Sequence, residues 1–241
     1  MTPQFLVLQH IDVEHPGIFR EFMREEGVRW DTVELDQGEA IPDVSDYDAL
    51  IVMGGPMDVW EEDAHGWLAQ EKTAIRTVVN ELERPYLGIC LGHQLLADAL
   101  GGRVAKAQQT EIGVMDVTLT AAGTQSGYFS GIAKSFPALQ WHGAEVASPP
   151  PGARVLAESP ACAIQALAVG RTAFSFQFHV EVEDSTVDDW GAIPAYHDAL
   201  DASFGPQGLD GFRADCASHM PGFNHLARRL WDNWRRTVGV A

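Results

Sequence analysis

Cysteine and basic side chains are scarce in this chain of 241 residues. Its three cysteines, Cys90, Cys162 and Cys216, are widely spaced, so the sequence offers neither a zinc motif nor a disulfide framework. The 16 lysines and arginines stand against 34 acidic residues, and a net charge of −18 would repel a phosphate backbone. Nucleic acid is therefore excluded as an expected partner, and a solvated acidic surface is the simplest interpretation of the charge.

Long apolar runs are absent as well. No stretch of about 18 apolar residues is available to span a membrane. The first ten residues, MTPQFLVLQH, lack the basic leader and the small-residue cleavage site of a secretion signal. We therefore expect a cytoplasmic protein with reduced thiols and no membrane partner.

Two kinds of hydrophobic pattern alternate in the first hundred residues. Short apolar or alternating runs predict strands at 4–9, 28–35, 48–55 and 85–90. Pro16 and Gly27 bracket a first helix between these runs, and residues 65–83 carry apolar side chains at helical spacing for a second. This order predicts an α/β fold with an open, mostly parallel central sheet flanked by helices.

The pattern changes after Gly102. Short strand-like runs separated by turn residues follow, and three helical stretches close the chain from Asp184 on. The sequence shows no repeat, no low-complexity segment and no obvious linker. We therefore expect a single domain over residues 1–241, with a core at 1–183 and a C-terminal helical segment at 184–241.

The stretch PYLGICLGHQLLADALGG, residues 85–102, contains the first candidate for chemistry. An apolar strand stops at Gly88-x-Cys90-x-Gly92 and turns directly into a helix, as in the nucleophile elbow of hydrolytic enzymes. Side chains at the two glycines would collide with neighbouring backbone. The helix N-terminus would lower the pKa of the thiol and favour the thiolate. The alternative is a structural cysteine at a tight turn, and a nucleophile needs a base.

Two histidines are candidates for that base. His93 follows Cys90 by three residues on the same helix, so its side chain should project to another side, and we interpret it as a packing residue. His179 ends the hydrophobic run AFSFQFHVEV, residues 173–182, and alternation places Glu181 on the same side of the extended chain. A carboxylate there can orient the imidazole, which predicts a Cys90–His179–Glu181 triad. Taken alone, His179 could equally be a buried core histidine.

The loop VMGGPMDVW, residues 52–60, follows the third predicted strand. Its Gly54-Gly55-Pro56 turn would bring bare backbone N–H groups to the carboxyl edge of the sheet, where active sites of parallel α/β folds gather. The N–H of Gly55, together with that of Leu91, could hold an oxyanion. The alternative is a plain turn.

These motifs, in this order, resemble the class I (cysteine-triad) glutamine amidotransferases, and among them the stand-alone members similar to GMP synthase. The stretches that carry the resemblance are GGP at 54–56, the elbow at 85–102, EIGVMDVTLT at 111–120 and FQFHVEV at 176–182. The resemblance implies the flavodoxin-like fold of that family. Val180 stands where the family usually has proline, and we expect the local geometry to survive because valine is a good strand former.

The resemblance implies a role for each matching residue. Cys90 is the nucleophile, His179 the general base and acid, and Glu181 its orienting partner. The backbone N–H groups of Gly55 and Leu91 form the oxyanion hole.

Five further residues are implied in substrate binding. The side chain of Gln94 helps to hold the glutamyl group, and the segment QWHGAEV, residues 140–146, contacts the α-amino acid end of the substrate through its backbone. The implied substrate-binding residues are Gly54, Gln94, Gln140, Trp141 and His142. His142 matches a position in the pocket wall and not in the triad. No metal ion and no organic cofactor is implied.

Three functions follow as hypotheses. The first is a glutaminase that hydrolyses L-glutamine and supplies ammonia to a separate synthetase, since no ATP-binding P-loop motif is present. The second is a free-standing γ-glutamyl peptidase that uses the same triad on γ-glutamyl compounds. The third is a non-catalytic binding or regulatory protein, which the complete triad argues against.

Overall fold

The structure is a computed structural model that describes residues 2–205 and 208–240. The strands are β1 (Gln4–Gln9), β2 (Arg29–Glu34), β3 (Ala49–Val52), β4 (Tyr86–Ile89), β5 (Arg103–Leu119), β6 (Ser135–Ser148), β7 (Arg154–Glu158), β8 (Ala166–Val169) and β9 (Ala173–Phe176). The α-helices are α1 (Phe19–Glu25), α2 (Trp67–Arg76), α3 (Leu91–Ala99), α4 (Ala121–Thr124), α5 (Thr186–Gly191), α6 (Pro194–Phe204) and α7 (Gly208–Val238).

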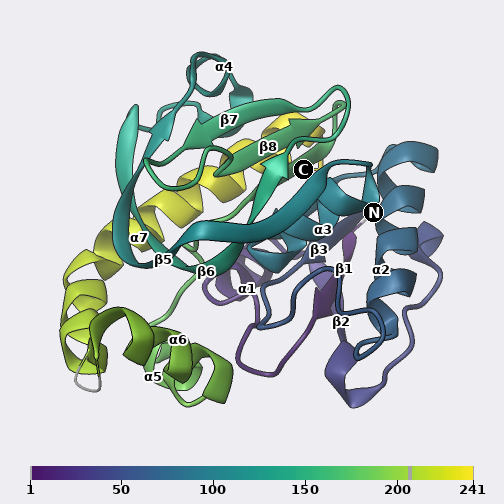
Figure 1. The fold of residues 1–241 in the computed structure, drawn as a ribbon. Helices are drawn as coiled ribbons and strands as arrows, with labels where there is room; N and C mark the ends of the chain where they lie inside the picture. Colours follow the sequence, from purple (N-terminus) through teal and green to yellow (C-terminus); the bar gives the residue numbers. More distant parts are fainter. Residues whose placement is uncertain (1, 206–207, 241) are drawn as a thin grey trace.

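Over the described residues the strands form one nine-stranded sheet in the order β2-β1-β3-β4-β9-β8-β7-β5-β6 (Figure 1). The strands from β2 to β9 in this order pair in parallel, and those from β9 to β6 pair antiparallel. The carboxyl ends of β3, β4 and β9 therefore meet at one edge, which is the edge that the Cys90 and His179 motifs share. The predicted α/β fold with helices flanking a central sheet is confirmed.

Side-chain alternation in β1 shows how the sheet is covered. Phe5 and Val7 belong to a core with α1 and α7, whereas Leu6 and Leu8 belong to a second core with α2 and α3. A strand with helices on both faces buries successive residues in opposite directions, which is why this run reads as continuously apolar. The predicted bounds of 4–9 coincide with those of β1.

Two strands differ in length from the prediction. The runs expected as separate strands after Gly102 join into one long strand, β5, which pairs with β6 as an antiparallel hairpin. A register shift between Lys106 and Glu111 bends this hairpin. Conversely, β9 ends at Phe176, three residues before His179, and His179 instead forms an isolated bridge with Leu139 of β6.

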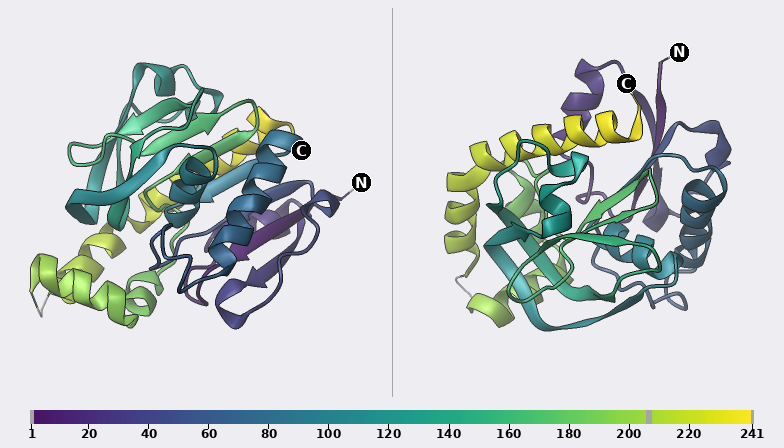
Figure 2. Two further views of the ribbon diagram at one scale, coloured as in Figure 1. Left: turned by 45° about the vertical axis from the view of Figure 1, so that its right-hand side comes forward. Right: turned by 90° about the horizontal axis from the view of Figure 1, so that it is seen from above.

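The helical end of the chain packs as three helices, α5, α6 and α7, as predicted. Helix α7 runs along one face of the sheet and ends beside β1, while α5 and α6 lie at the far end of α7 (Figures 1 and 2). Phe5 of β1 contacts the Trp234 ring edge-on at 5.8 Å. No helix within residues 2–205 and 208–240 combines the length and the apolarity needed to cross a bilayer.

Candidate active site

Cys90 sits at the turn between β4 and α3 in a backbone conformation that few non-glycine residues adopt. Its φ is 51° and its ψ is −102°. A Cβ at Gly88 would lie 2.7 Å from the carbonyl oxygen of Gly92, and a Cβ at Gly92 would collide with the carbonyl of Val52. The elbow therefore requires both glycines, as predicted, and it holds the Cys90 thiol at the carboxyl edge of the sheet.

His179 and Glu181 lie together at the same edge. The Nδ1 atom of His179 is 2.6 Å from Oε1 of Glu181, and both side chains are almost fully buried. The second carboxylate oxygen of Glu181 accepts the N–H of Val180 at 2.9 Å. Proline has no N–H to donate, so the valine at this position adds a hydrogen bond that the usual family residue could not make. The carboxylate is thus fixed on both oxygens and can orient the imidazole.

Cys90 and His179 influence each other's pKa through their charges. Burial raises the pKa of the Cys90 thiol, and His179 opposes this effect. Burial acts to lower the pKa of His179, but Glu181 and Cys90 outweigh it, so the pKa lies well above its usual value. The sequence predicted a thiol pKa lowered by the helix N-terminus. In the structure, burial is the larger effect, and the thiolate depends on the imidazolium beside it.

A further polar side chain contacts the thiol. Gln177, two residues before His179, donates from Nε2 to the sulfur of Cys90 at 3.5 Å. The Oε1 atom of Gln177 accepts the amide of Gln94 at 3.0 Å, and Gln94 also donates to the carbonyl of Ala144 on β6. Gln94 thus joins the elbow to the β5–β6 hairpin, and Gln177 supplies a donor that would stabilise negative charge on the sulfur.

Gly55 and Leu91 both line the cavity at Cys90, and a buried ion pair holds the turn that carries Gly55. Nδ1 of His10 lies 2.7 Å from the carbonyl oxygen of Gly54, and Nε2 of His10 lies 3.1 Å from the carboxylate of Glu71. In a trans peptide the carbonyl of residue 54 and the N–H of residue 55 point in opposite directions. Fixing the carbonyl of Gly54 therefore fixes the direction of the Gly55 N–H.

The charge state of His10 suits this role. Burial acts to lower its pKa, but the charge and hydrogen bond of Glu71 outweigh that effect, together with the carbonyl of Gly54, and the pKa lies above its usual value. The charged form of His10 is thus stabilised relative to a free imidazole. Donation from His10 to the Gly54 carbonyl polarises the peptide group and strengthens its N–H as a donor.

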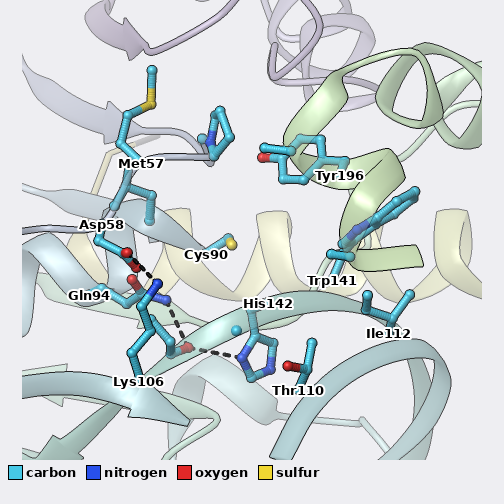
Figure 3. A pocket seen from close by; sticks show the side chains of 17 residues that line it. Met57, Asp58, Cys90, Gln94, Lys106, Thr110, Ile112, Trp141, His142 and Tyr196 are labelled. Carbon is cyan, nitrogen blue, oxygen red and sulfur yellow. Dashed lines mark hydrogen bonds and ion pairs between the residues drawn. The ribbon is translucent and has the colours of Figure 1, made fainter. Parts of the chain in front are cut away.

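A cavity of about 270 Å³ opens over Cys90 (Figure 3). Its wall includes Gln94, Trp141 and His142 among the residues predicted to bind substrate. At its mouth Lys106 of β5 forms an ion pair with Asp58 at 2.5 Å. Oppositely charged groups at one end and a nucleophile at the other suit a small zwitterionic substrate that carries a reactive carbonyl.

His142 is held in the cavity wall by a buried network. Its Nδ1 lies 3.0 Å from the carbonyl of Ala144, and its Nε2 lies 3.1 Å from the carboxylate of Glu111. Glu111 also accepts hydrogen bonds from Ser159 and Gln165. Cys162 lies close enough that single ligand atoms of Glu111, His142 and Cys162 fall within 4.8 Å of one another. These hydrogen bonds already occupy both carboxylate oxygens of Glu111. We therefore interpret the cluster as a hydrogen-bond network that holds the cavity wall in place.

Three residues singled out from the sequence lie outside the cavity wall. His93 is fully buried, with Nδ1 at 2.9 Å from the Ser175 hydroxyl and Nε2 at 3.2 Å from the carbonyl of Ile164, as its interpretation as a packing residue requires. Gly54 lies behind the wall, against His10. Gln140 is fully buried, and neither polar atom of its side chain has a partner among the described residues. Its side chain does not line the cavity over Cys90.

Several residues around the triad were not found by sequence reasoning. Gln177 shares the strand end with His179 at a spacing of two, and alternation could have identified it. His10 follows directly on β1 at the carboxyl edge of the sheet, which is also a readable signal. Trp190, whose ring contacts that of His179 at 4.6 Å, and Tyr196, which lines the cavity, come from α5 and α6 and have no such signal.

Known proteins resemble this chain in sequence and in fold. Residues 18–189 match the family described as glutamine amidotransferase class-I. A glutamine-hydrolysing GMP synthase subunit of Sulfurisphaera tokodaii is 40% identical over 141 residues, covering 58% of this chain and 70% of that protein. Gamma-glutamyl peptidase 2 of Arabidopsis thaliana is 28% identical over 168 residues, covering 68% of this chain and 66% of that protein. The crystal structure of a glutamine amidotransferase from Methylobacillus flagellatus has a TM-score of 0.88 at 26% identity, covering 99% of this chain and 96% of that one.

Proposed function

The chain belongs to the class I glutamine amidotransferases, and we propose that it hydrolyses the side-chain amide of L-glutamine through a γ-glutamyl thioester on Cys90. The observation that carries the proposal is a buried thiol on a strained elbow whose charge acts on an imidazole that a carboxylate orients at 2.6 Å. A non-catalytic protein on this scaffold would not need to keep all three groups together, and that alternative is set aside.

The first half of the reaction makes the thioester. His179 takes the proton of Cys90, and the sulfur attacks the carboxamide carbon, so that a C–S bond forms and the carbonyl electron pair moves to oxygen. The N–H groups of Gly55 and Leu91 hold this oxyanion, each worth about 3 kcal/mol of barrier. His179 then protonates the nitrogen, the C–N bond breaks, and ammonia leaves.

The second half releases glutamate. Water attacks the thioester carbon while His179 takes a proton from that water. The same two N–H groups hold the second oxyanion. The C–S bond then breaks, and the sulfur recovers its proton from His179. Glu181 keeps the imidazole in position through both halves. Gln94, Trp141 and His142 line the cavity wall. They contact the glutamyl part of the substrate, and the backbone of the adjacent Gly54 and Gln140 supports them.

We further propose that the ammonia passes to a separate synthetase, because a glutamine-hydrolysing subunit of GMP synthase is among the relatives. Among the described residues Trp60 and Phe204 are the large apolar side chains with substantial exposure, at 44% and 52%. Two isolated side chains do not make an extended apolar patch, so such a partner would dock mainly through polar and charged groups.

A second function has support from the peptidase relative. Gamma-glutamyl peptidase 2 suggests the same triad acting on γ-glutamyl compounds with a larger leaving amine. The two functions differ in the leaving group alone, since the glutamyl part and the thioester are shared.

The test is glutamate release by the purified chain from L-glutamine and from γ-glutamyl peptides in parallel. We expect Cys90→Ala and His179→Ala to abolish turnover of every substrate while the far-ultraviolet circular dichroism spectrum is unchanged. Turnover that persists in Cys90→Ala would refute the proposed nucleophile. Slow turnover of glutamine alone supports a glutaminase that depends on its synthetase for full activity, and fast turnover of the peptides supports the peptidase.

A further inference from the structure

Glu14 and Tyr196 form a buried polar pair beside the triad, and both lie outside residues 18–189, which match the family. Glu14 is 1% exposed, and its Oε1 accepts the hydroxyl proton of Tyr196. Its Oε2 has no partner among the described residues. A buried carboxylate oxygen without a partner is costly, so this arrangement needs an explanation beyond packing.

Tyr196 of this pair lines the cavity, and aromatic contacts connect it to His179. The ring of Tyr196 is 6.0 Å from that of Trp190, and the ring of Trp190 is 4.6 Å from that of His179. Glu14 also acts through its charge on Cys90. In Figure 3 Tyr196 lies on one side of Cys90, and Gln94, Lys106 and His142 lie on the other. Lining residues therefore extend from Cys90 both toward Tyr196 and toward Gln94 and His142.

The inference rests on the proposed function, which assigns these two sides of the cavity. The glutamyl group lies on the side of Gln94 and His142, so the leaving nitrogen faces Tyr196. Oε2 of Glu14 lies against the Gly54 turn, where a Cβ on Gly54 would strike it. The pair is therefore close to the oxyanion turn as well as to the proton donor.

We propose that Tyr196, backed by Glu14, forms the subsite of the leaving amine and selects ammonia or an uncharged amine over a leaving group that carries a carboxylate. The Tyr196 hydroxyl donates its proton to Glu14, which leaves its oxygen lone pairs free to accept an N–H of the leaving nitrogen. Glu14 makes that oxygen a stronger acceptor and favours the positive charge that develops on nitrogen as His179 protonates it.

The same carboxylate discriminates by repulsion. A γ-glutamyl peptide releases an amino acid or peptide whose own carboxylate would lie beside Tyr196, close to the buried Glu14. Like charges at short range in a poorly solvated site disfavour binding strongly. Burial also raises the pKa of Tyr196 well above its usual value, with Glu14 adding to the effect, so the phenol remains a neutral hydroxyl.

The experiment compares three substrates at pH 8. Burial raises the pKa of Glu14, so an alkaline pH favours its carboxylate form. The substrates are L-glutamine, γ-glutamylglycinamide and γ-glutamylglycine, of which the last two have the same number of heavy atoms and differ in the charge of the leaving group. We expect the wild-type kcat/KM to favour the glycinamide over the glycine derivative by about tenfold or more, and Glu14→Gln to reduce that ratio below about threefold.

Tyr196→Phe tests the direct contact. It should lower kcat for L-glutamine about tenfold with KM changed less than about threefold, because the interaction strengthens as charge develops on nitrogen. Tyr47→Phe is the matched control, since Tyr47 also donates its hydroxyl to a carboxylate, that of Asp31 at 2.9 Å, but does not line the cavity. It should behave as wild type. A ratio in Glu14→Gln equal to that of wild type would overturn the inference.

A binding measurement separates this inference from the proposed function. In the Cys90→Ala background, calorimetry should show γ-glutamylglycinamide binding about tenfold more tightly than γ-glutamylglycine, and addition of Glu14→Gln should remove the difference. This holds even if the wild-type chain turns over none of the substrates, an outcome that would refute the proposed hydrolysis alone. Equal affinities of the two ligands in the Cys90→Ala background would refute the subsite.

Discussion

At the scale of single residues, two histidines were weighed as the base for Cys90, and their environments are opposite. His93 is near Cys90 in the sequence, and His179 shares its edge of the sheet. His179 lies beside a carboxylate and a thiol, whereas His93 faces a hydroxyl and a backbone carbonyl. Burial lowers the pKa of His93 to about 3, because no neighbouring carboxylate opposes it. The same residue type thus serves as a candidate proton carrier in one place and as a neutral packing group in the other.

The low pKa of His93 makes a prediction about stability. In the unfolded chain His93 is protonated as the pH falls below about 6.5, whereas in the folded chain it stays neutral down to about pH 3. The contribution of His93 to stability is therefore complete above pH 6.5 and is lost as the pH falls. Relative to His93→Asn, the free energy of unfolding of the wild type should drop by about 1.4 kcal/mol per pH unit below 6.5. Urea denaturation at pH 7.5 and pH 5.0 measures this difference.

Activity gives the companion result. We expect His93→Asn to retain most of the glutaminase rate, while His179→Ala loses it. A stability difference that stays constant between the two pH values would show that the folded chain protonates His93 at pH 5.0 to the same extent as the unfolded chain. A loss of activity in His93→Asn equal to that of His179→Ala would show that the base has been misassigned.

His10 provides a second prediction at this scale, about the direction of the Gly55 N–H. The double variant His10→Ala/Glu71→Gln removes the donor to the Gly54 carbonyl without leaving a charged carboxylate alone. We expect kcat for glutamine to fall about 10- to 100-fold with KM within about threefold, since the oxyanion exists only along the reaction path.

The control variant for His10 keeps an N–H donor to the Gly54 carbonyl but removes the imidazole and the charge of Glu71. Asparagine can place an N–H near the former position of Nδ1, so His10→Asn/Glu71→Gln should recover most of kcat. Steady-state kinetics of the two double variants decide the matter. Equal losses in both would mean that the ion pair acts on folding and not on the turn.

At the scale of elements, the elbow shows what local sequence can specify. A strand at 85–90, the strained turn at Cys90 and the need for Gly88 and Gly92 were predicted from the motif, and β4 spans Tyr86–Ile89. The atoms that a side chain at Gly88 would meet belong to Tyr86 and Gly92, a few positions away, whereas a side chain at Gly92 would meet Val52 of the neighbouring strand. The end of β9 was not predicted, because His179 leaves the ladder to bridge Leu139 on a strand 40 residues away in sequence. Periodicity indicates which way a side chain points but not which strand will pair with it.

The same limit applies to the site. The triad could be read from two short motifs, yet Tyr196 meets Glu14 across 182 residues of sequence. Nothing in the apolar spacing of α6 distinguishes Tyr196 from an ordinary core residue. Contacts of this kind depend on how α6 packs over the hairpin, through Trp141 and Trp190, and that packing is decided by the whole fold.

The elbow also provides a prediction with a matched control. In Gly92→Ala the new methyl group would meet the backbone carbonyl of Val52, and the Gly92 N–H, which donates to the carbonyl of Met53 at 3.0 Å, would shift with it. We expect a loss of about 2–3 kcal/mol in unfolding free energy. Gly66→Ala, at the start of α2, meets nothing within 4 Å and should leave stability unchanged or slightly raised. Thermal unfolding of both variants tests the contrast, and equal melting temperatures would contradict it.

At the scale of the whole molecule, the C-terminal helices have two roles: they cover one face of the sheet and they supply a residue of the cavity wall. Helix α7 covers a face of the sheet with Leu230, Trp231 and Trp234, and α6 brings Tyr196 to the cavity. The indole N–H of Trp234 donates to the carbonyl of Tyr86, the first residue of β4, at 3.2 Å. The strand that leads to the elbow is therefore in direct contact with the end of the chain.

This coupling predicts that a chain truncated after residue 183 will not fold cooperatively. Replacing one buried tryptophan by alanine costs about 3–5 kcal/mol, and a domain of this kind is stable by about 5–15 kcal/mol in total. Truncation removes Trp231 and Trp234 together, exposes Phe5, and leaves the Tyr86 carbonyl without its donor. Trp234→Ala alone should remain folded with a lower melting temperature. Thermal melts followed by circular dichroism, on the truncated chain and on Trp234→Ala, measure both effects. A sharp transition in the truncated chain would contradict the prediction and would mean that residues 1–183 fold independently. Tyr196 would then belong to a segment that packs onto a core already formed.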